Sequence, residues 1–150
     1  ELKNEDIIEV IKNAISYLKT RSPNKVKYTY LYPENKKIIV PLNVHLFDWV
    51  IENLTRNAID AMGGEGEITF SLFEDDKYVY IDISDTGKGI NKKHFKTIFN
   101  PGYTSKKRGW GLGLSLSHRI ISEYHSGKIF VKSSVINKGT TFRIMLKNKV

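Results

Sequence analysis

The stretch from Asn43 to Gly63 reads NVHLFDWVIENLTRNAIDAMG, and the interpretation of the whole chain starts from it. Its apolar residues keep a helical period between an N-capping residue and a terminating glycine, which predicts a long amphipathic helix. A rotation of about 100° per residue places Asn53, Asn57 and Asp60 within about 60° of one another, at the border of the apolar face. An ordinary amphipathic boundary would show the same pattern. Amide oxygens one turn apart can also ligate a hard cation such as Mg²⁺.

The segments around this helix alternate in type. Residues 5–19 and residues 112–125 also carry apolar positions at helical spacing. The remaining regular segments form three predicted strand pairs with hairpin-length links: 25–32 with 37–40, 67–73 with 78–84, and 128–135 with 140–146. This order predicts an α+β fold, a two-layer α/β sandwich whose mixed, mostly antiparallel sheet carries its helices on one face.

The composition is that of one soluble globular domain. The chain has 150 residues, 40% hydrophobic and 27% charged, which excludes a disordered or fibrous protein. Cysteine is absent, which excludes disulfides, thiolate metal sites and cysteine nucleophiles. The sequence contains no apolar stretch of membrane-spanning length and no signal peptide, so we expect a cytoplasmic location. Because the sequence starts at Glu1 rather than Met, we expect a longer parent protein, for which a membrane anchor stays open.

The charge balance favours an anionic ligand. Lysine and arginine number 24 against 16 aspartate and glutamate residues, a net charge of +8, which suits nucleotide phosphates, nucleic acids or acidic proteins. The basic residues are scattered, however, and the only tight cluster is Lys106-Lys107-Arg108. A nucleic-acid binder would concentrate them on one helix or stripe, so we expect no nucleic-acid partner.

Two glycine-rich stretches are candidate ligand loops. Asp85-Thr86-Gly87-Lys88-Gly89 follows a predicted strand, so a carboxylate at the strand end precedes a loop whose glycines let a ligand approach the backbone. Gly109-Trp110-Gly111-Leu112-Gly113-Leu114 opens the third predicted helix, where backbone N–H groups and the helix dipole favour an anion. It matches neither the P-loop nor the Rossmann pattern. A plain glycine turn would explain the first stretch equally well, and a mobile glycine-rich loop would explain the second.

Taken in order, four stretches resemble the ATP-site motifs of the sensor histidine kinase catalytic domain. They are Glu52-Asn53-Leu54-Thr55-Arg56-Asn57-Ala58, Asp85-Thr86-Gly87-Lys88-Gly89-Ile90, Ile98-Phe99-Asn100-Pro101-Gly102-Tyr103-Thr104-Ser105-Lys106 and Gly109-Trp110-Gly111-Leu112-Gly113-Leu114. That domain belongs to the superfamily that includes type II topoisomerases, Hsp90 chaperones and mismatch-repair ATPases. The resemblance covers nearly the whole chain and is weakest over residues 1–40. It implies the Bergerat ATP-binding fold, with ATP and Mg²⁺ as the bound groups.

The resemblance also implies roles for individual residues. By position, Asn57 would ligate Mg²⁺ with Asn53 nearby, and Asp85 would accept a hydrogen bond from the adenine amine. The adenine pocket would be shaped by Gly87, Gly89 and Ile90. A lid over residues 91–110 would be anchored by Phe99. The remaining nucleotide contacts would come from Thr104, Ser105, Lys106, Lys107, Gly109, Gly111, Leu112, Gly113, Leu114 and Thr140.

One position departs from the family pattern. Many members carry a basic residue three positions after the metal-binding Asn, whereas this chain has Asp60. The lysines of the lid are therefore the expected source of positive charge near the phosphates.

Three classes of protein within the superfamily stay open: a sensor kinase, a self-sufficient ATPase and a regulatory serine kinase of the anti-sigma type. Self-sufficient ATPases resemble one another in having a Glu four residues before the metal-binding Asn, where it activates water. Asn53 stands there in this chain, and an amide cannot accept a proton at neutral pH. Glu52 lies about 140° around the helix from Asn57 and faces away. The lid sequence fits sensor kinases better than the anti-sigma class.

The sensor kinase reading implies a reaction that needs a second module. The chain would bind Mg-ATP and supply the γ-phosphoryl group to a histidine on a separate helical dimerisation module, which this chain lacks. The four histidines have no acidic neighbour positioned to take a proton, so we expect no catalytic residue within the chain: His45, His94, His118 and His125. The expected partners are those dimerisation helices and the receiver domain of a response regulator. We expect the parent protein to be a homodimer and the isolated domain a monomer.

Overall fold

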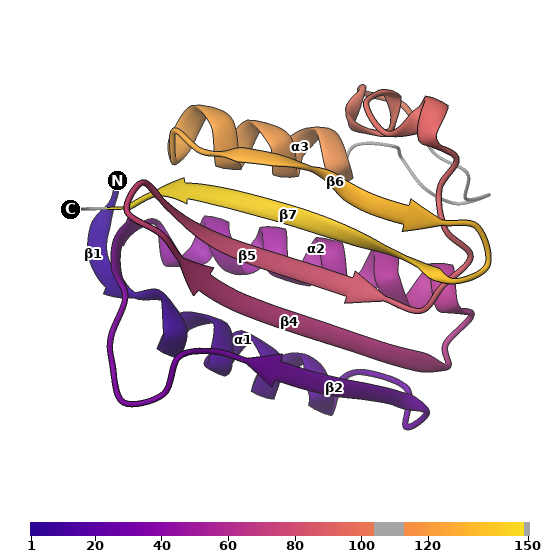
Figure 1. The fold of residues 1–150 in the computed structure, drawn as a ribbon, viewed down its shortest axis with the longest axis horizontal. Coiled ribbons are helices and arrows are strands. Elements are labelled where there is room, and N and C mark those ends of the chain that lie inside the picture. The colour runs from indigo at the N-terminus through magenta and orange to yellow at the C-terminus, as the bar shows by residue number, and fades with distance from the viewer. Residues whose placement is uncertain (104–112, 149–150) are drawn as a thin grey trace.

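The computed structural model describes residues 1–103 and 113–148 (Figure 1). The elements follow one another as β1 (Lys3–Asp6), α1 (Ile7–Thr20), β2 (Val26–Leu31), β3 (Ile39–Leu42), α2 (Val44–Met62), β4 (Gly66–Glu74), β5 (Tyr78–Asp85), the 3₁₀ turns η1 (Lys92–His94) and η2 (Thr97–Phe99), α3 (Gly113–Arg119), the π-helical segment η3 (Ile120–Tyr124), β6 (Lys128–Val135) and β7 (Gly139–Lys147).

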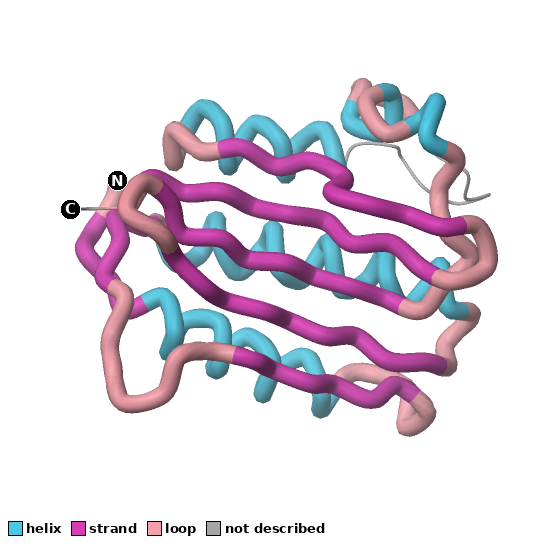
Figure 2. Tube along the Cα trace, in the orientation of Figure 1, coloured by secondary structure: helices cyan, strands magenta, loops and turns pink. Residues whose placement is uncertain are grey.

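A five-stranded sheet forms one layer of the domain, and the helices form the other (Figures 1 and 2). The strand order is β2-β4-β5-β7-β6, with β2 parallel to β4 and every other neighbouring pair antiparallel. Alternate residues of β4 and β7 point into the core, as in β4, where Ile68, Phe70 and Leu72 are buried against the helices. All three helices lie on the same face. The predicted two-layer α+β fold is therefore confirmed.

The predicted hairpin between residues 25–32 and 37–40 is wrong. β2 pairs with β4 in parallel instead, with Tyr28 opposite Ile68. β3 spans Ile39–Leu42 and forms a separate two-stranded sheet with β1, antiparallel, so that Asp6 lies opposite Ile39. The parallel pairing has a physical reason: α2 lies between β2 and β4 in the sequence, and a crossover through a helix joins parallel strands.

Strand β1 has no counterpart among the predicted elements. Its sequence, KNED, is polar and carries no apolar alternation, so the helical pattern alone predicts a helix from residue 5. The helix begins at Ile7 because Asp6 caps it: the Asp6 carboxylate accepts a hydrogen bond from the N–H of Ile8 at 3.2 Å. The same oxygen accepts from the N–H of Ile38 at 3.2 Å, which ties α1 to the segment before β3.

Helix α2 begins and ends where its sequence predicts. Oδ1 of Asn43 accepts from the N–H of Leu46 at 3.1 Å, and Gly63 ends the helix in the left-handed conformation with φ of 67°. Phe47 and Leu54 are buried on the side that packs on the sheet. Asn53 and Asn57 lie at the border of this buried side, where Asn53 is buried and Asn57 half-buried.

The third predicted helix, 112–125, is made of two parts within the described residues. α3 runs over Gly113–Arg119 and continues into η3, which ends before His125. His125 is buried, its Nδ1 donates to the carbonyl oxygen of Ile120 at 2.9 Å, and its Nε2 accepts from the N–H of Asn43 at 3.1 Å. This side chain therefore joins the end of η3 to the start of α2.

Across residues 1–103 and 113–148, no helix combines the length and the apolar character that a membrane crossing requires.

Candidate functional site

Asp85 stands at the end of β5, where strand gives way to loop. Its Oδ1 accepts hydrogen bonds from the N–H of Gly87 at 2.8 Å and from the N–H of Thr140 at 3.2 Å. Burial raises the pKa of Asp85, and the two N–H donors act in the opposite direction. No group among the described residues donates to Oδ2. The carboxylate is therefore fixed by one oxygen and can accept a ligand N–H through the other.

Gly87 and Gly89 lie so close to the backbone of other segments that a Cβ would not fit at either position. A Cβ at Gly87 would lie 2.7 Å from the carbonyl oxygen of Ala61, near the end of α2. At Gly89, φ is 82° and a Cβ would lie 2.5 Å from the carbonyl oxygen of Val135. The N–H of Lys88 donates to the same Ala61 oxygen at 3.0 Å. The loop after β5 is thus held against the C-terminal end of α2.

A serine that the sequence analysis missed connects this loop to the β6–β7 turn. Ser134 Oγ accepts from the N–H of Ile90 at 2.7 Å, lies 2.8 Å from Oγ1 of Thr140, and donates to the carbonyl oxygen of Gly139 at 3.1 Å. Thr140 is 4% exposed, so the residue that donates its N–H to Asp85 is itself buried. The sequence holds no signal for this role, since one serine in a strand is unremarkable.

Asn53 and Asn57 lie one helical turn apart on α2. Asn53 is buried and its Nδ2 donates to Oγ of Ser117 at 3.1 Å, whereas Asn57 is half-buried and Asp60 exposed. Ala61 follows Asn57 by one further turn, so Asn53, Asn57 and Ala61 lie in one row that spans about 12 Å along the axis of α2. The loop after Asp85 contacts Ala61, at the C-terminal end of this row.

The side-chain amide oxygens of Asn53 and Asn57 are ligands of a kind that Mg²⁺ accepts. In the described part of the chain, no group of three His, Cys, Asp or Glu residues is placed to hold a metal ion. Amide oxygens are hard donors, and Mg²⁺ is commonly bound through few protein ligands with waters and substrate phosphates completing its coordination. Asn57, with Asn53 beside it, can supply such a ligand.

The first residue of α3 touches the same amide. A Cβ at Gly113 would lie 2.5 Å from Oδ1 of Asn53, so only glycine allows α3 to begin this close to α2. Leu114 and Ile90 are partly buried against the core. The predicted contacts at Thr104, Ser105, Lys106, Lys107, Gly109, Gly111 and Leu112 lie outside the described residues.

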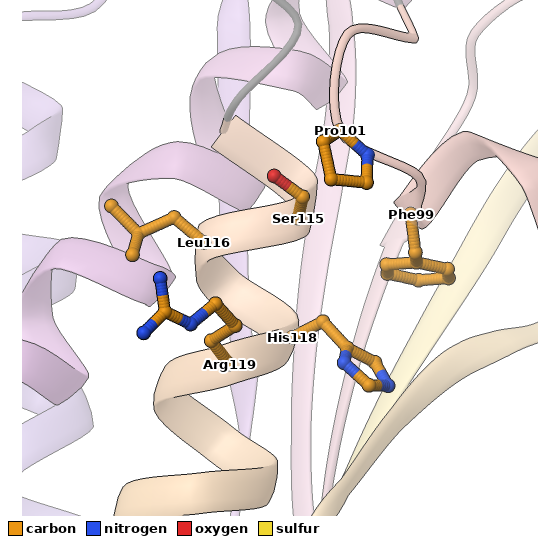
Figure 3. A pocket seen from close by; sticks show the side chains of 6 residues that line it. All are labelled: Phe99, Pro101, Ser115, Leu116, His118 and Arg119. Atoms are coloured by element: carbon orange, nitrogen blue, oxygen red, sulfur yellow. The ribbon is translucent and has the colours of Figure 1, made fainter.

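Phe99, the predicted anchor of the lid, packs against two other elements. Its ring packs at 6.1 Å from the ring of Phe142 in β7 and at 5.8 Å from that of His118 in α3. A hollow of about 400 Å³ lies beside it, lined by Phe99, Pro101, Ser115, Leu116, His118 and Arg119 (Figure 3). Asp85, Asn53 and Asn57 are not among its lining residues, and Phe99 is the predicted site residue that lines it.

One histidine lies near a carboxylate of α2. His45 lies one turn before Asp48 at the start of α2, and its charge acts on that carboxylate. Burial raises the pKa of Asp48, an effect that the charge of His45 opposes and that of Glu52 reinforces. Oδ1 of Asp48 is buried without a hydrogen-bond partner in the described part of the chain. His45 therefore acts on the Asp48 carboxylate electrostatically, and Oδ1 of Asp48 accepts no hydrogen bond from it.

Glu52 is engaged elsewhere. It forms an ion pair with Arg56 on the exposed side of α2, whereas Asn53 points to Ser117 on α3. Glu52, the carboxylate nearest in sequence to Asn53, is therefore paired with Arg56 and does not face the candidate site.

Comparison with known proteins identifies the family. The profile of the histidine kinase-, DNA gyrase B-, and HSP90-like ATPases matches residues 43–150. Sensor histidine kinase ZraS of Escherichia coli is 42% identical over 97 residues, which are 65% of this chain and 20% of ZraS. Sporulation kinase E of Bacillus subtilis is 41% identical over 99 residues, 65% of this chain and 13% of that protein.

A solved structure extends the similarity to the fold of the whole chain. The catalytic domain of histidine kinase ThkA is 26% identical and superposes with a TM-score of 0.87, covering 99% of this chain and 96% of that one. The chain spans about a fifth or less of the length of the two curated relatives. With more than half of its residues matched by the family profile, the chain belongs to the histidine kinase-, DNA gyrase B- and HSP90-like ATPases.

Proposed function

We propose that this chain is the catalytic domain of a sensor histidine kinase. It binds Mg-ATP and supplies the γ-phosphoryl group to a histidine on a separate helical dimerisation module, within a two-component system. Its named relatives ZraS and ThkA are histidine kinases, which supports this choice within the family.

The single observation that carries the proposal is the state of the Asp85 carboxylate. Two backbone N–H groups hold Oδ1, and Oδ2 accepts nothing from the described residues. A fixed acceptor of this kind selects a purine that presents an amine and rejects one that presents a carbonyl. ATP rather than GTP is therefore the expected ligand.

The position of Asn53 supports phosphoryl transfer to another protein group rather than to water. Asn53 is buried with its Nδ2 donating to Ser117, and an amide does not take a proton from water at neutral pH. Glu52 is paired with Arg56. Transfer depends on placing an attacking atom in line with the phosphorus, so a histidine with its own base must come from the second module.

A response regulator is the proposed downstream partner. The histidine kinase ThkA has been solved in complex with the response regulator protein TrrA. We extend that type of partner to the parent protein of this chain.

Calorimetric titration with ATP and GTP in the presence of Mg²⁺, together with a turnover assay, tests the proposal. The parent chain is expected to bind ATP at least tenfold more tightly than GTP and to release negligible phosphate. Equal affinity for the two nucleotides, or sustained ATP hydrolysis by the chain alone, would contradict the proposal.

A further inference from the structure

The side-chain amide of Asn53 lies against one face of α3 and contacts it at both ends. Its Nδ2 donates to Oγ of Ser117 at 3.1 Å, and its Oδ1 lies 2.5 Å from where a Cβ would stand on Gly113. Gly113 and Ser117 are one turn apart, so the two ends of the amide meet the same face of the helix. Asn53 is 9% exposed and Ser117 is 0% exposed, so water does not substitute for this hydrogen bond.

Ser117 differs from Thr55 and Ser122, two other hydroxyl residues in the helices. Thr55 and Ser122 each donate to the carbonyl oxygen four residues earlier, at 2.7 Å, which is the common arrangement in a helix. The hydrogen bond given for Ser117 runs instead to a side chain on another helix, and in it the hydroxyl oxygen accepts. In this arrangement Nδ2 of Asn53 faces the Ser117 hydroxyl, and Oδ1 lies beside Gly113.

The orientation of the amide decides what it offers to a cation. With Nδ2 held by Ser117, Oδ1 is turned away from that hydroxyl. An amide oxygen attracts a divalent cation or a water in its coordination shell, whereas the NH₂ group repels it. Asn57, the residue expected to ligate Mg²⁺, is one turn along the same helix.

We infer that Ser117 is a positioning residue for the metal-dependent part of nucleotide binding, acting through the orientation of the Asn53 amide. This inference rests on the proposed function, because it assigns a role within the Mg-ATP site. Removal of the hydroxyl frees the amide to rotate and leaves the adenine contacts at Asp85 unchanged. The Mg²⁺-dependent gain in ATP affinity then falls, and the affinity without Mg²⁺ does not.

Titration of ATP in excess Mg²⁺ and in EDTA separates these quantities. The proteins compared are the parent chain, Ser117→Ala, Asn53→Ala, the double variant, and the matched control Ser122→Ala. The loss of one neutral hydrogen bond predicts an approximately fivefold fall in the Mg²⁺-dependent gain for Ser117→Ala, with the affinity in EDTA within about twofold of the parent. The Ser122→Ala control retains the parent's gain. In the Asn53→Ala background, Ser117→Ala has no further effect on the gain.

Three results would overturn the inference. Ser117→Ala could keep the parent's Mg²⁺-dependent gain, could lose affinity equally in Mg²⁺ and in EDTA, or could lower the gain further in the Asn53→Ala background. Each would mean that the hydroxyl only packs the helices or acts by another route. Failure of the proposed function is a separate result, since the parent chain itself would then show no Mg-ATP binding.

Discussion

The carboxylate of Asp85 at the end of β5 is held by the backbone N–H of Thr140 at the start of β7, 3.2 Å away. The two residues are 55 positions apart in the sequence and meet because β5 and β7 are antiparallel neighbours in the sheet. The hydrogen bond fixes Oδ1, and Oδ2 accepts no hydrogen bond from the residues that the structure describes.

Replacement of Asp85 by Asn or Ala is expected to weaken ATP binding by roughly 1–3 kcal/mol, since a ligand amine loses its acceptor in a buried site. Calorimetry at neutral pH measures the change, with GTP as the comparison ligand. Because burial raises the pKa of Asp85, the acceptor is lost by protonation as the pH falls, and ATP affinity should decline on acidification in the parent but not in Asp85→Asn. Unchanged ATP affinity in Asp85→Ala would exclude Asp85 from adenine recognition.

Ser134→Ala removes a hydroxyl that joins the Ile90 N–H to the β6–β7 turn. A partly buried N–H loses its partner, so we expect ATP affinity to fall several-fold, about 1 kcal/mol, through a looser Asp85 loop. Ser133→Ala is the matched control, because Ser133 is the exposed neighbour on β6. Equal affinities for the two variants would show that the loop does not need this connection.

Asn57→Ala is expected to remove the Mg²⁺ dependence of ATP affinity while leaving the fold intact, because the side chain is only half-buried. Titrations with and without Mg²⁺ measure the first effect, and thermal unfolding measures the second. A variant that binds Mg-ATP like the parent would make Asn57 a boundary residue of an amphipathic helix.

Asp48→Asn tests the carboxylate whose Oδ1 is buried without a partner in the described part of the chain. The folded-state pKa of Asp48 is raised, so the parent loses stability as the pH rises through that pKa. The neutral amide avoids this loss. We expect the variant to be more stable at pH 7 by less than about 1 kcal/mol, since water reaches part of the side chain, and to have no advantage near pH 4. Urea unfolding at the two pH values provides the measurement, and a gain confined to acidic pH would reverse the predicted sign.

Local patterns in the sequence predicted most of the fold and the polar residues of the site. Helix α2 carries its own start and stop signals at Asn43 and Gly63, and Asn53, Asn57 and Asp85 were singled out by the ordered motifs that resemble the sensor histidine kinase domain. Strand β1 could not be predicted because its polar residues pair with β3 through backbone groups alone. Ser117 and Ser134 were missed for a related reason: each acts through a partner more than 40 residues away, which only the folded chain brings near.

The most direct test of the proposed function is a phosphotransfer experiment with γ-labelled ATP. The 150-residue chain is incubated with Mg-ATP alone, and then with a separately expressed helical module of the parent protein that carries the phosphoacceptor histidine. We expect no acid-labile label on the chain in either mixture, and acid-labile label on the module only when both are present. Acid-labile label on the chain alone, or steady ATP turnover that Asn53→Ala abolishes, would instead identify a self-sufficient enzyme.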